Sequence, residues 1–495
     1  MASRRDFLVI FSGRIASALI SIVSLRITTS LLTPSDYGIY ALLGAFQSFC
    51  GLLLVNPVGQ HLNRHTHAWW DDGTLLQRLV RYNRYIVGVS FFISLPVMVW
   101  WLQSQTTSSN NCLLFAVAAG AAVASIVYLG TWNLTLIPML NLLGFRARSA
   151  SWTIATTVFS LAFSFLLVMQ YHSAVAWMFG QAAGAAIGAW FAWFFLRRYH
   201  ADHNPAHYQS DVPVFLLDKQ TIKTFCLPLA VATGFMWLQN AGYRFVVGGV
   251  WGAEELGILV VGLGISAQLW AIIDSLAMQF LGPYLYRHFT EAKSDVQSGM
   301  ILSDFVNVLA PVYAMFAGFN VLCAATILNV LTNERYHIAA PFVVFGTMVE
   351  FARCITNLWS NAAQAKRQTK GVILPYVLGA VTVWGGALGV INFGNGINAF
   401  AMVLIGGGIV TCASMIIIMQ RLLPVRIDAY RWLAGFVVLG ISFTLAAIIP
   451  ISDKGVYQNL GMLLLCGGLI CACMAAMLWR NPALNRLLVV QLRKE

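Results

Sequence analysis

The sequence predicts an all-α polytopic membrane protein with about 14 transmembrane helices. Three observations support this fold class: 59% of the 495 residues are hydrophobic, only 10% are charged, and the mean hydropathy is +0.74. A soluble domain carries about 25% charged and about 45–50% apolar residues. Because one soluble core cannot bury this much apolar surface, we expect lipid to surround helices of roughly 20 apolar residues each.

Fourteen apolar runs are long enough to cross a bilayer. They are residues 6–31, 37–59, 84–104, 112–138, 151–171, 174–197, 225–249, 256–283, 305–331, 338–362, 371–391, 397–420, 431–450 and 457–479. Arg14 and Arg26 interrupt the first run, behind the basic start MASRRDFL. We therefore expect an uncleaved first helix rather than a signal peptide.

The basic residues predict the orientation of these helices. With the N-terminus inside, 24 of the 30 Lys and Arg residues fall in inner segments, four fall within helices, and only Arg335 and Lys454 fall outside. Cytoplasmic segments collect Lys and Arg. Both termini are thus expected in the cytoplasm, with the chain in the bacterial inner membrane. The net charge of +12 reflects this topology and predicts no nucleic-acid partner.

No motif in the sequence indicates a cofactor, a metal or ATP hydrolysis. The nine cysteines are scattered, without disulfide or zinc spacing. His200, His203 and His207 lie in a long inner segment, but Pro205 breaks any helix that would align them. The phosphate-binding pattern GxxxxGK[ST] does not occur.

The chain contains two similar junctions between apolar runs. LLTPSDYGIYALLGAF (31–46) and GVWGAEELGILVVGLG (249–264) share an apolar run, an acidic break, Gly-Ile and a second apolar run. Farther on, GQHLNRH (59–65) matches GPYLYRH (282–288) at Gly, Leu, Arg and His. The offsets are 219 and 223 residues, a slip of about one helical turn. These matches predict two parallel six-helix repeats plus two extra C-terminal helices.

The repeats predict the domain organisation. We expect an N-lobe at 1–198, a cytoplasmic linker at 199–224, a C-lobe at 225–420, and the last two helices with a cytoplasmic tail at 421–495. Parallel repeats around a midplane cavity are typical of transporters. A membrane polymerase or ligase would place its chemistry on a large outer loop. The longest one here, near 103–112, has no His, Arg or carboxylate, so no enzymatic activity is expected.

The duplicated junctions also resemble a known family. LLTPSDYGIYALLGAF after an Arg-containing helix, residues 224–262, NERYHIAAPF (333–342) and AKRQTK (365–370) resemble Wzx-type flippases of the multidrug/oligosaccharidyl-lipid/polysaccharide (MOP) exporter superfamily. The resemblance covers nearly the whole chain and is diffuse. Motifs characteristic of the lipid II flippase branch are not found.

The resemblance implies alternating-access flipping of an undecaprenyl-diphosphate-linked oligosaccharide for O-antigen, capsule or exopolysaccharide. Its implied partners are that glycolipid, membrane lipid, and the polymerase and chain-length proteins of the same pathway.

A diphosphate that crosses a low-dielectric interior needs compensating positive charge. Helix 1 places Arg14 and Ser21 on one polar stripe, and helix 7 places Trp237, Asn240 and Arg244 on another. We expect these residues to bind the cargo. Two alternatives stay open: Arg14 pairs with a neighbouring helix, and Arg244 extends to the lipid headgroups.

Helix 10 repeats the pattern with Arg353 and Asn357, which are also expected to bind the cargo. Glu350 lies one turn before Arg353, so a pair between them is the alternative. Asp274 and Glu350 are the candidates for ion coupling. A multidrug or organic-cation antiporter is the second candidate function, but four intramembrane arginines against two deep acids favour an anionic cargo.

Overall fold

The computed structural model describes most of the chain, and within that part every regular element is a helix. The described residues are 4–104, 112–203, 218–291, 294–366, 368–448, 455–479, 481–484 and 486. They divide into two compact units, 1–248 and 249–495. The all-α class predicted from the sequence is confirmed.

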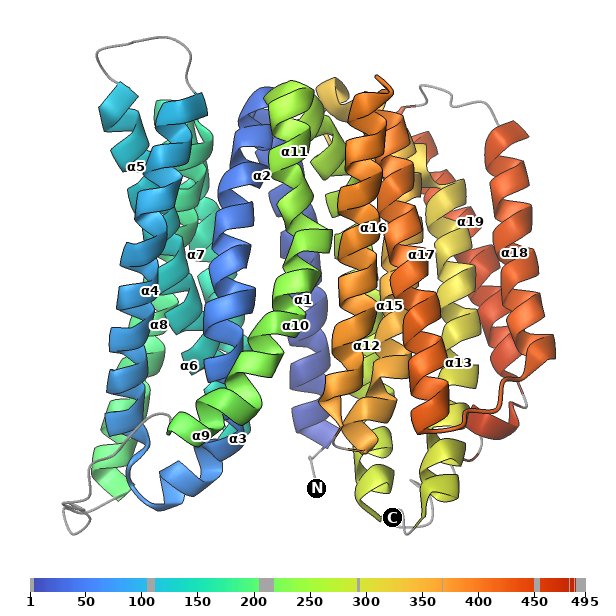
Figure 1. Ribbon diagram of the computed structural model, residues 1–495, viewed down its shortest axis with the longest axis horizontal. Helices are drawn as coiled ribbons and strands as arrows, with labels where there is room; N and C mark the ends of the chain where they lie inside the picture. Colours follow the sequence, from blue (N-terminus) through green and yellow to red (C-terminus); the bar gives the residue numbers. More distant parts are fainter. Residues whose placement is uncertain are drawn as a thin grey trace. The chain divides into compact units, whose positions relative to one another are not determined.

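The first unit consists of seven long helical rods, the last of which ends two residues beyond the boundary at Gly248 (Figure 1). Three of the rods contain π-helical turns, labelled η. The elements are α1 (Arg4–Leu31), α2 (Pro34–Phe49), η1 (Cys50–Val55), α3 (Asn56–Asp71), α4 (Leu75–Ser104), α5 (Cys112–Ser125), η2 (Ile126–Gly130), α6 (Thr131–Leu142), α7 (Arg146–Tyr171), α8 (Ala174–His203), α9 (Lys219–Thr221), η3 (Ile222–Cys226), α10 (Leu227–Trp237), η4 (Leu238–Gly242) and α11 (Tyr243–Val250).

The second unit contains the remaining helices, two of them 3-10 turns. They are α12 (Gly252–Glu291), α13 (Asp295–Leu322), α14 (Ala324–Leu331), η5 (Glu334–Ala339), α15 (Ala340–Ala365), η6 (Thr369–Val372), α16 (Ile373–Asn392), α17 (Ile397–Leu422), α18 (Ala429–Ile448) and α19 (Val456–Leu478). The predicted lobe and linker boundaries remain a prediction, and residues 225–248 pack in the first unit.

Thirteen helices in the described part are long and apolar enough to cross a membrane. The first predicted span coincides with α1, which is 28 residues long and whose described apolar stretch is Leu19–Leu31. The predicted single helix at 305–331 is wrong in its bounds. Ser294 caps a helix that begins at Asp295, and the rod breaks at Cys323 before α14 begins.

The two similar junctions use different backbone chemistry. Thr33 caps α2 by accepting a 3.2 Å hydrogen bond from the Asp36 amide, and Pro34 occupies the first helical turn. The second junction turns at Gly252, whose φ of +88° lies in the left-handed region that favours glycine. The shared sequence pattern therefore marks a helix start at both places, reached by two routes.

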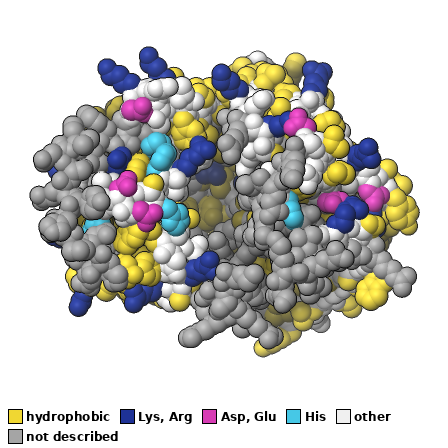
Figure 2. All heavy atoms as spheres, turned by 90° about the horizontal axis from the view of Figure 1, so that it is seen from below, with side chains coloured by type: hydrophobic (Ala, Val, Ile, Leu, Met, Phe, Trp, Pro, Cys, Tyr) yellow, Lys and Arg dark blue, Asp and Glu magenta, His cyan; other side chains and the backbone are white. Residues whose placement is uncertain are grey.

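Each unit has its own apolar core. In the first, Ile86, Val89, Ile93 and Val97 line one face of α4 at helical spacing and are buried. In the second, Trp270 of α12 is buried against α13 and α15. Polar side chains of the first unit gather at the end where α4 begins, seen at the left of Figure 2. The charge pattern predicts that this end is cytoplasmic.

Candidate functional site

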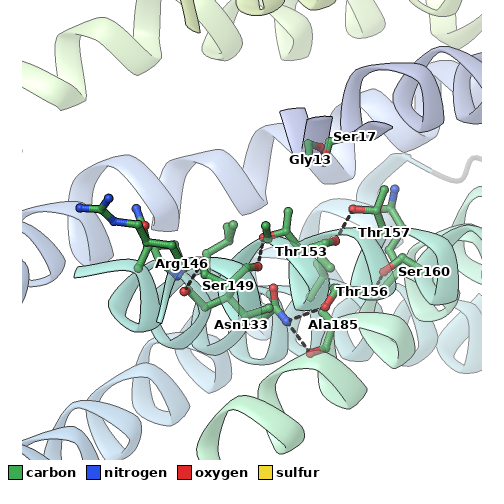
Figure 3. Close-up of a pocket in the computed structure, with 18 of the residues that line it drawn as sticks. Gly13, Ser17, Asn133, Arg146, Ser149, Thr153, Thr156, Thr157, Ser160 and Ala185 are labelled. Atoms are coloured by element: carbon green, nitrogen blue, oxygen red, sulfur yellow. Dashed lines mark hydrogen bonds between the residues drawn. The ribbon is translucent and has the colours of Figure 1, made fainter. Parts of the chain in front are cut away.

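A polar cavity of about 530 Å³ lies within the first unit, among α1, α2, η2, α6, α7 and α8. Eleven of its nineteen lining residues are polar, and one of these, Arg146, is charged. The lining contains no carboxylate and no aromatic ring. Figure 3 shows Gly13 and Ser17 of α1 across the cavity from α7. Ligand sites commonly have volumes of about 300–1,000 Å³.

One face of α7 supplies most of the polar lining. Its five hydroxyl residues fall within roughly a 100° arc at 100° per residue. They are Ser149, Thr153, Thr156, Thr157 and Ser160. We call this set the α7 hydroxyl face. Arg146 begins the same helix, so a positive charge and a row of hydroxyls line the cavity along a single helix.

Close packing between α7 and α8 holds this face in place. Ser164 donates a 2.9 Å hydrogen bond to the Trp177 carbonyl, and Ser160 donates one of 3.2 Å to the Gln181 carbonyl. Gly180 and Gly184 of α8 permit the approach, because a Cβ on either would overlap the α7 backbone. Small residues at spacing four bring membrane helices together in this way.

Asn133 of α6 joins the same wall. Its Nδ2 donates to the Ala185 carbonyl at 3.1 Å and to the Thr156 hydroxyl at 3.3 Å (Figure 3). The residue is only 7% exposed, and both side-chain hydrogen bonds that it makes among the described residues involve Nδ2 rather than Oδ1. A carboxamide held by its nitrogen leaves the oxygen as a fixed acceptor at the cavity wall.

The helix 7 stripe predicted to bind cargo makes contacts inside the first unit. Trp237 Nε1 donates to the Ala45 carbonyl at 3.0 Å, and Arg244 Nη1 donates to the Ala41 carbonyl at 3.2 Å. Their donors thus attach α10 and α11 to α2. The side chain of Asn240, the other predicted residue of this stripe, makes no hydrogen bond within the described part of the chain.

Thr233, on the same stripe, bonds to a π-helical turn. A π-helical turn shifts the i to i−4 pairing and frees carbonyl groups. In η1 the Leu52 carbonyl accepts from Thr233 Oγ1 at 2.8 Å, and the Leu54 carbonyl accepts from Tyr85 OH at 2.8 Å. Side chains from α10 and α4 therefore satisfy this irregular stretch of the α2–η1–α3 rod.

A second polar group lies in the second unit. Asp274 Oδ1 accepts a 2.7 Å hydrogen bond from Tyr313 OH, and Tyr313 packs edge-on against Trp270. Glu350 forms an ion pair with Arg353 one turn away on α15. Asp274 lies on α12 and Glu350 on α15, two helices that pack against each other. The two candidate ion-coupling carboxylates thus belong to one cluster.

Arg353, Asn357 and Ser21, which were also predicted to bind the cargo, do not line the cavity. Arg353 is 44% exposed even though Glu350 pairs with it, and Asn357 is exposed one turn further along α15. Ser21 donates to the Ser17 carbonyl at 2.9 Å, one turn from the cavity. Arg14 lies on α1 next to the lining residue Gly13, but its side chain is outside the described residues. The role of these side chains in cargo binding stays a prediction.

The sequence analysis missed the α7 hydroxyl face and Arg146 as a cavity residue. The signal was present, since Ser149, Thr153, Thr157 and Ser160 recur at spacings of three and four within an apolar run. The residues predicted to bind the cargo lie on helices that carry an arginine within the membrane. The α7 stripe has hydroxyls but no charged residue at mid-helix, so charge alone did not indicate it.

Among the comparisons with known proteins, only the comparison with solved structures gives matches. No protein-family model and no curated protein sequence matches the chain. The structure of the lipid II flippase MurJ in an inward closed conformation aligns with a TM-score of 0.66 at 11% identity, over 97% of this chain and 99% of that one. This chain has the fold of that flippase.

Two MATE transporter structures also align, with lower scores. An inward-facing multidrug resistance MATE family transporter of the MOP superfamily gives a TM-score of 0.48 at 12% identity, over 88% of this chain and 99% of that one. A eukaryotic MATE transporter gives 0.49 at 13% identity, over 89% and 96%. The Wzx-type assignment stays a proposal.

Proposed function

We propose that this protein is a MOP-type flippase that moves an undecaprenyl-diphosphate-linked oligosaccharide across the inner membrane. The observation that carries the proposal is the lining of the first unit's cavity: hydroxyls, amides and Arg146, without a carboxylate. Neutral hydrogen-bonding groups suit sugar hydroxyls, and a guanidinium suits phosphate. The shared fold with the lipid II flippase supports the same class of cargo.

The energetic argument concerns desolvation. A glycan headgroup cannot enter hydrocarbon without losing its hydrogen bonds to water, at a cost of a few kcal/mol for each polar group left unpaired. A cavity between membrane helices that offers fixed donors and acceptors lowers this cost. The α7 hydroxyl face, Asn133 and Gln47 supply such groups from three different rods. These groups would hydrogen-bond to the glycan in place of water while the glycolipid crosses the membrane, which is what a flippase requires.

A second candidate function, an ion-coupled multidrug or organic-cation antiporter, has one observation in its favour. Asp274 and Glu350 lie on the packed helices α12 and α15 of the second unit, and a carboxylate pair can hold a cation. Tyr313 and Arg353 already engage these two carboxylates. We therefore assign this cluster to coupling rather than to the cargo.

The test is translocation in proteoliposomes that contain the purified full-length chain. The probe is radiolabelled undecaprenyl-diphosphate-linked N-acetylglucosamine, and a membrane-impermeant glycosyltransferase reports how much of it reaches the outer leaflet. We expect transfer to exceed that of protein-free vesicles. Transfer equal to protein-free vesicles, together with ethidium exchange driven by a proton or sodium gradient, would replace the flippase by the antiporter.

A further inference from the structure

The wall that α7 gives to the first unit's cavity offers a ligand hydrogen-bond acceptors rather than donors. Thr153 and Thr157 donate their hydroxyl protons to the carbonyls of Ser149 and Thr153, at 2.8 and 2.9 Å. A hydroxyl that donates one bond still has lone pairs to accept others. Because their protons are committed to α7 itself, these hydroxyls can only accept from a ligand. Asn133 Oδ1, fixed through its nitrogen, is also an acceptor.

Hydrogen-bond donors line the cavity from α2, α6 and α7. Gln47 of α2 and Asn141 of α6 line the cavity with side-chain amides, and neither makes a side-chain hydrogen bond among the described residues. Arg146 adds a guanidinium at the start of α7. The cavity therefore presents acceptors from the α7 hydroxyl face and side-chain amides from α2 and α6. A ligand that fits must donate and accept several hydrogen bonds at once.

Three ligand classes fit this lining poorly. An organic cation needs a carboxylate or an aromatic face, and the lining has neither. A divalent metal needs carboxylate or imidazole ligands, and no group of three such residues was found in the part of the chain searched. A free acyl chain would leave Asn133 Oδ1 and the threonine hydroxyls unpaired. A polyhydroxylated sugar meets both the donors and the acceptors.

We propose that this cavity is a binding site for the carbohydrate portion of the lipid-linked cargo. The α7 hydroxyl face accepts hydrogen bonds from sugar hydroxyls, and Arg146 lies where the phosphate end of the glycolipid would meet the start of the helix. This inference rests on the proposed function and deepens it, because it places the sugar inside the first unit. It assigns Thr153, Thr157, Asn133 and Asn141 as residues that distinguish a glycolipid from a bare lipid diphosphate.

The test compares two probes on the purified full-length protein in nanodiscs: undecaprenyl diphosphate and undecaprenyl-diphosphate-linked N-acetylglucosamine. The double variant Thr153→Val/Thr157→Val keeps the side-chain shape and removes both acceptors. We expect about tenfold weaker binding of the sugar-bearing lipid, as for two neutral hydrogen bonds, and unchanged binding of the bare lipid. Asn141→Ala, an exposed position, should change binding in the same direction without disturbing the α7–α8 wall.

Ser151→Ala is the matched control. Ser151 lies on the same helix and makes the same type of bond, to the Ala147 carbonyl at 2.9 Å, but it does not line the cavity. It should leave both affinities unchanged. Equal affinity of the wild-type protein for the two lipids, or an equal loss for both in the variants, would overturn the sugar site while the flippase function stands. Failure of the wild-type protein to bind either lipid would overturn both.

Discussion

The indole Nε1 of Trp237 donates a 3.0 Å hydrogen bond to the backbone carbonyl of Ala45, which ties α10 to α2. A tryptophan on a polar stripe suggests a platform for a sugar ring, but the only polar side-chain atom of Trp237 already bonds to the protein backbone. The ring itself packs edge-on against Phe49 at 5.1 Å. The polar stripe of helix 7 thus positions two helices relative to each other within the first unit.

The first prediction separates positioning from cargo binding on that stripe. Trp237→Phe keeps an aromatic ring and removes the bond to Ala45, so we expect a loss of about 1 kcal/mol in stability. Asn240→Ala is the control. The side chain of Asn240 makes no hydrogen bond within the described residues, so this substitution should leave stability unchanged. Thermal unfolding in detergent measures both. If Asn240→Ala destabilises the protein as much as Trp237→Phe does, the result contradicts the positioning role of the Trp237 hydrogen bond.

The second prediction concerns the α7–α8 contact. A Cβ on Gly184 would overlap the backbone of Ser160, whereas one on Gly88 of α4 would meet no atom within 4 Å. We expect Gly184→Ala to lower the amount of folded protein in membranes several-fold, because the helices must separate. Gly88→Ala should express at the wild-type level. Fluorescence-detected size-exclusion chromatography compares the two, and similar profiles would contradict the close packing.

The third prediction concerns ion coupling in the second unit. If Asp274 and Glu350 exchange protons or sodium, Asp274→Asn or Glu350→Gln should abolish gradient-driven transport and leave the fold intact. Tyr313→Phe removes only the 2.7 Å hydrogen bond to Asp274, so it should alter the pH dependence of transport while some transport continues. Transport in proteoliposomes with and without an imposed gradient checks this. Full gradient-driven transport by both neutral variants would exclude these carboxylates from coupling.

The fourth prediction separates charge from geometry at Arg14. If Arg14 holds the diphosphate, Arg14→Lys keeps the charge but loses the bidentate fork, so it should keep partial export. Arg14→Gln loses the charge and should fail at a normal membrane level. Surface polysaccharide in a strain that lacks the native gene is the measurement. Normal polysaccharide from a well-expressed Arg14→Gln variant would remove the diphosphate role.

The fifth prediction concerns topology. Because basic residues collect at the inner ends of the helices, a reporter fused after Arg198 or at the C-terminus should be cytoplasmic. A reporter at Ser109, a position outside the described residues, should be periplasmic. Paired phosphatase and fluorescent-protein fusions distinguish the two sides. A periplasmic C-terminus would break the fourteen-helix arrangement.

The sequence by itself determined that the chain lies in lipid and that its membrane-spanning segments are helices. Lipid requires that each spanning segment satisfy its own backbone, so the apolar runs predicted where the membrane helices lie, while α4 and α13 begin nine and ten residues earlier than the runs at 84–104 and 305–331. It also placed Glu350 and Arg353 one turn apart, where a pair can form locally. The structure contains that ion pair. Local spacing was enough for both.

Only the tertiary structure decided what the polar side chains do. Helical periodicity shows that Thr233, Trp237 and Arg244 share a face, but a shared face meets either a cavity or a neighbouring helix. Packing against α2 turned this face toward backbone carbonyls. The glycines of α8 let α7 approach closely, and the α7 hydroxyls line a cavity to which α1, α2, α6 and α8 also contribute. Such outcomes depend on contacts between residues far apart in the chain, and no single helix encodes them.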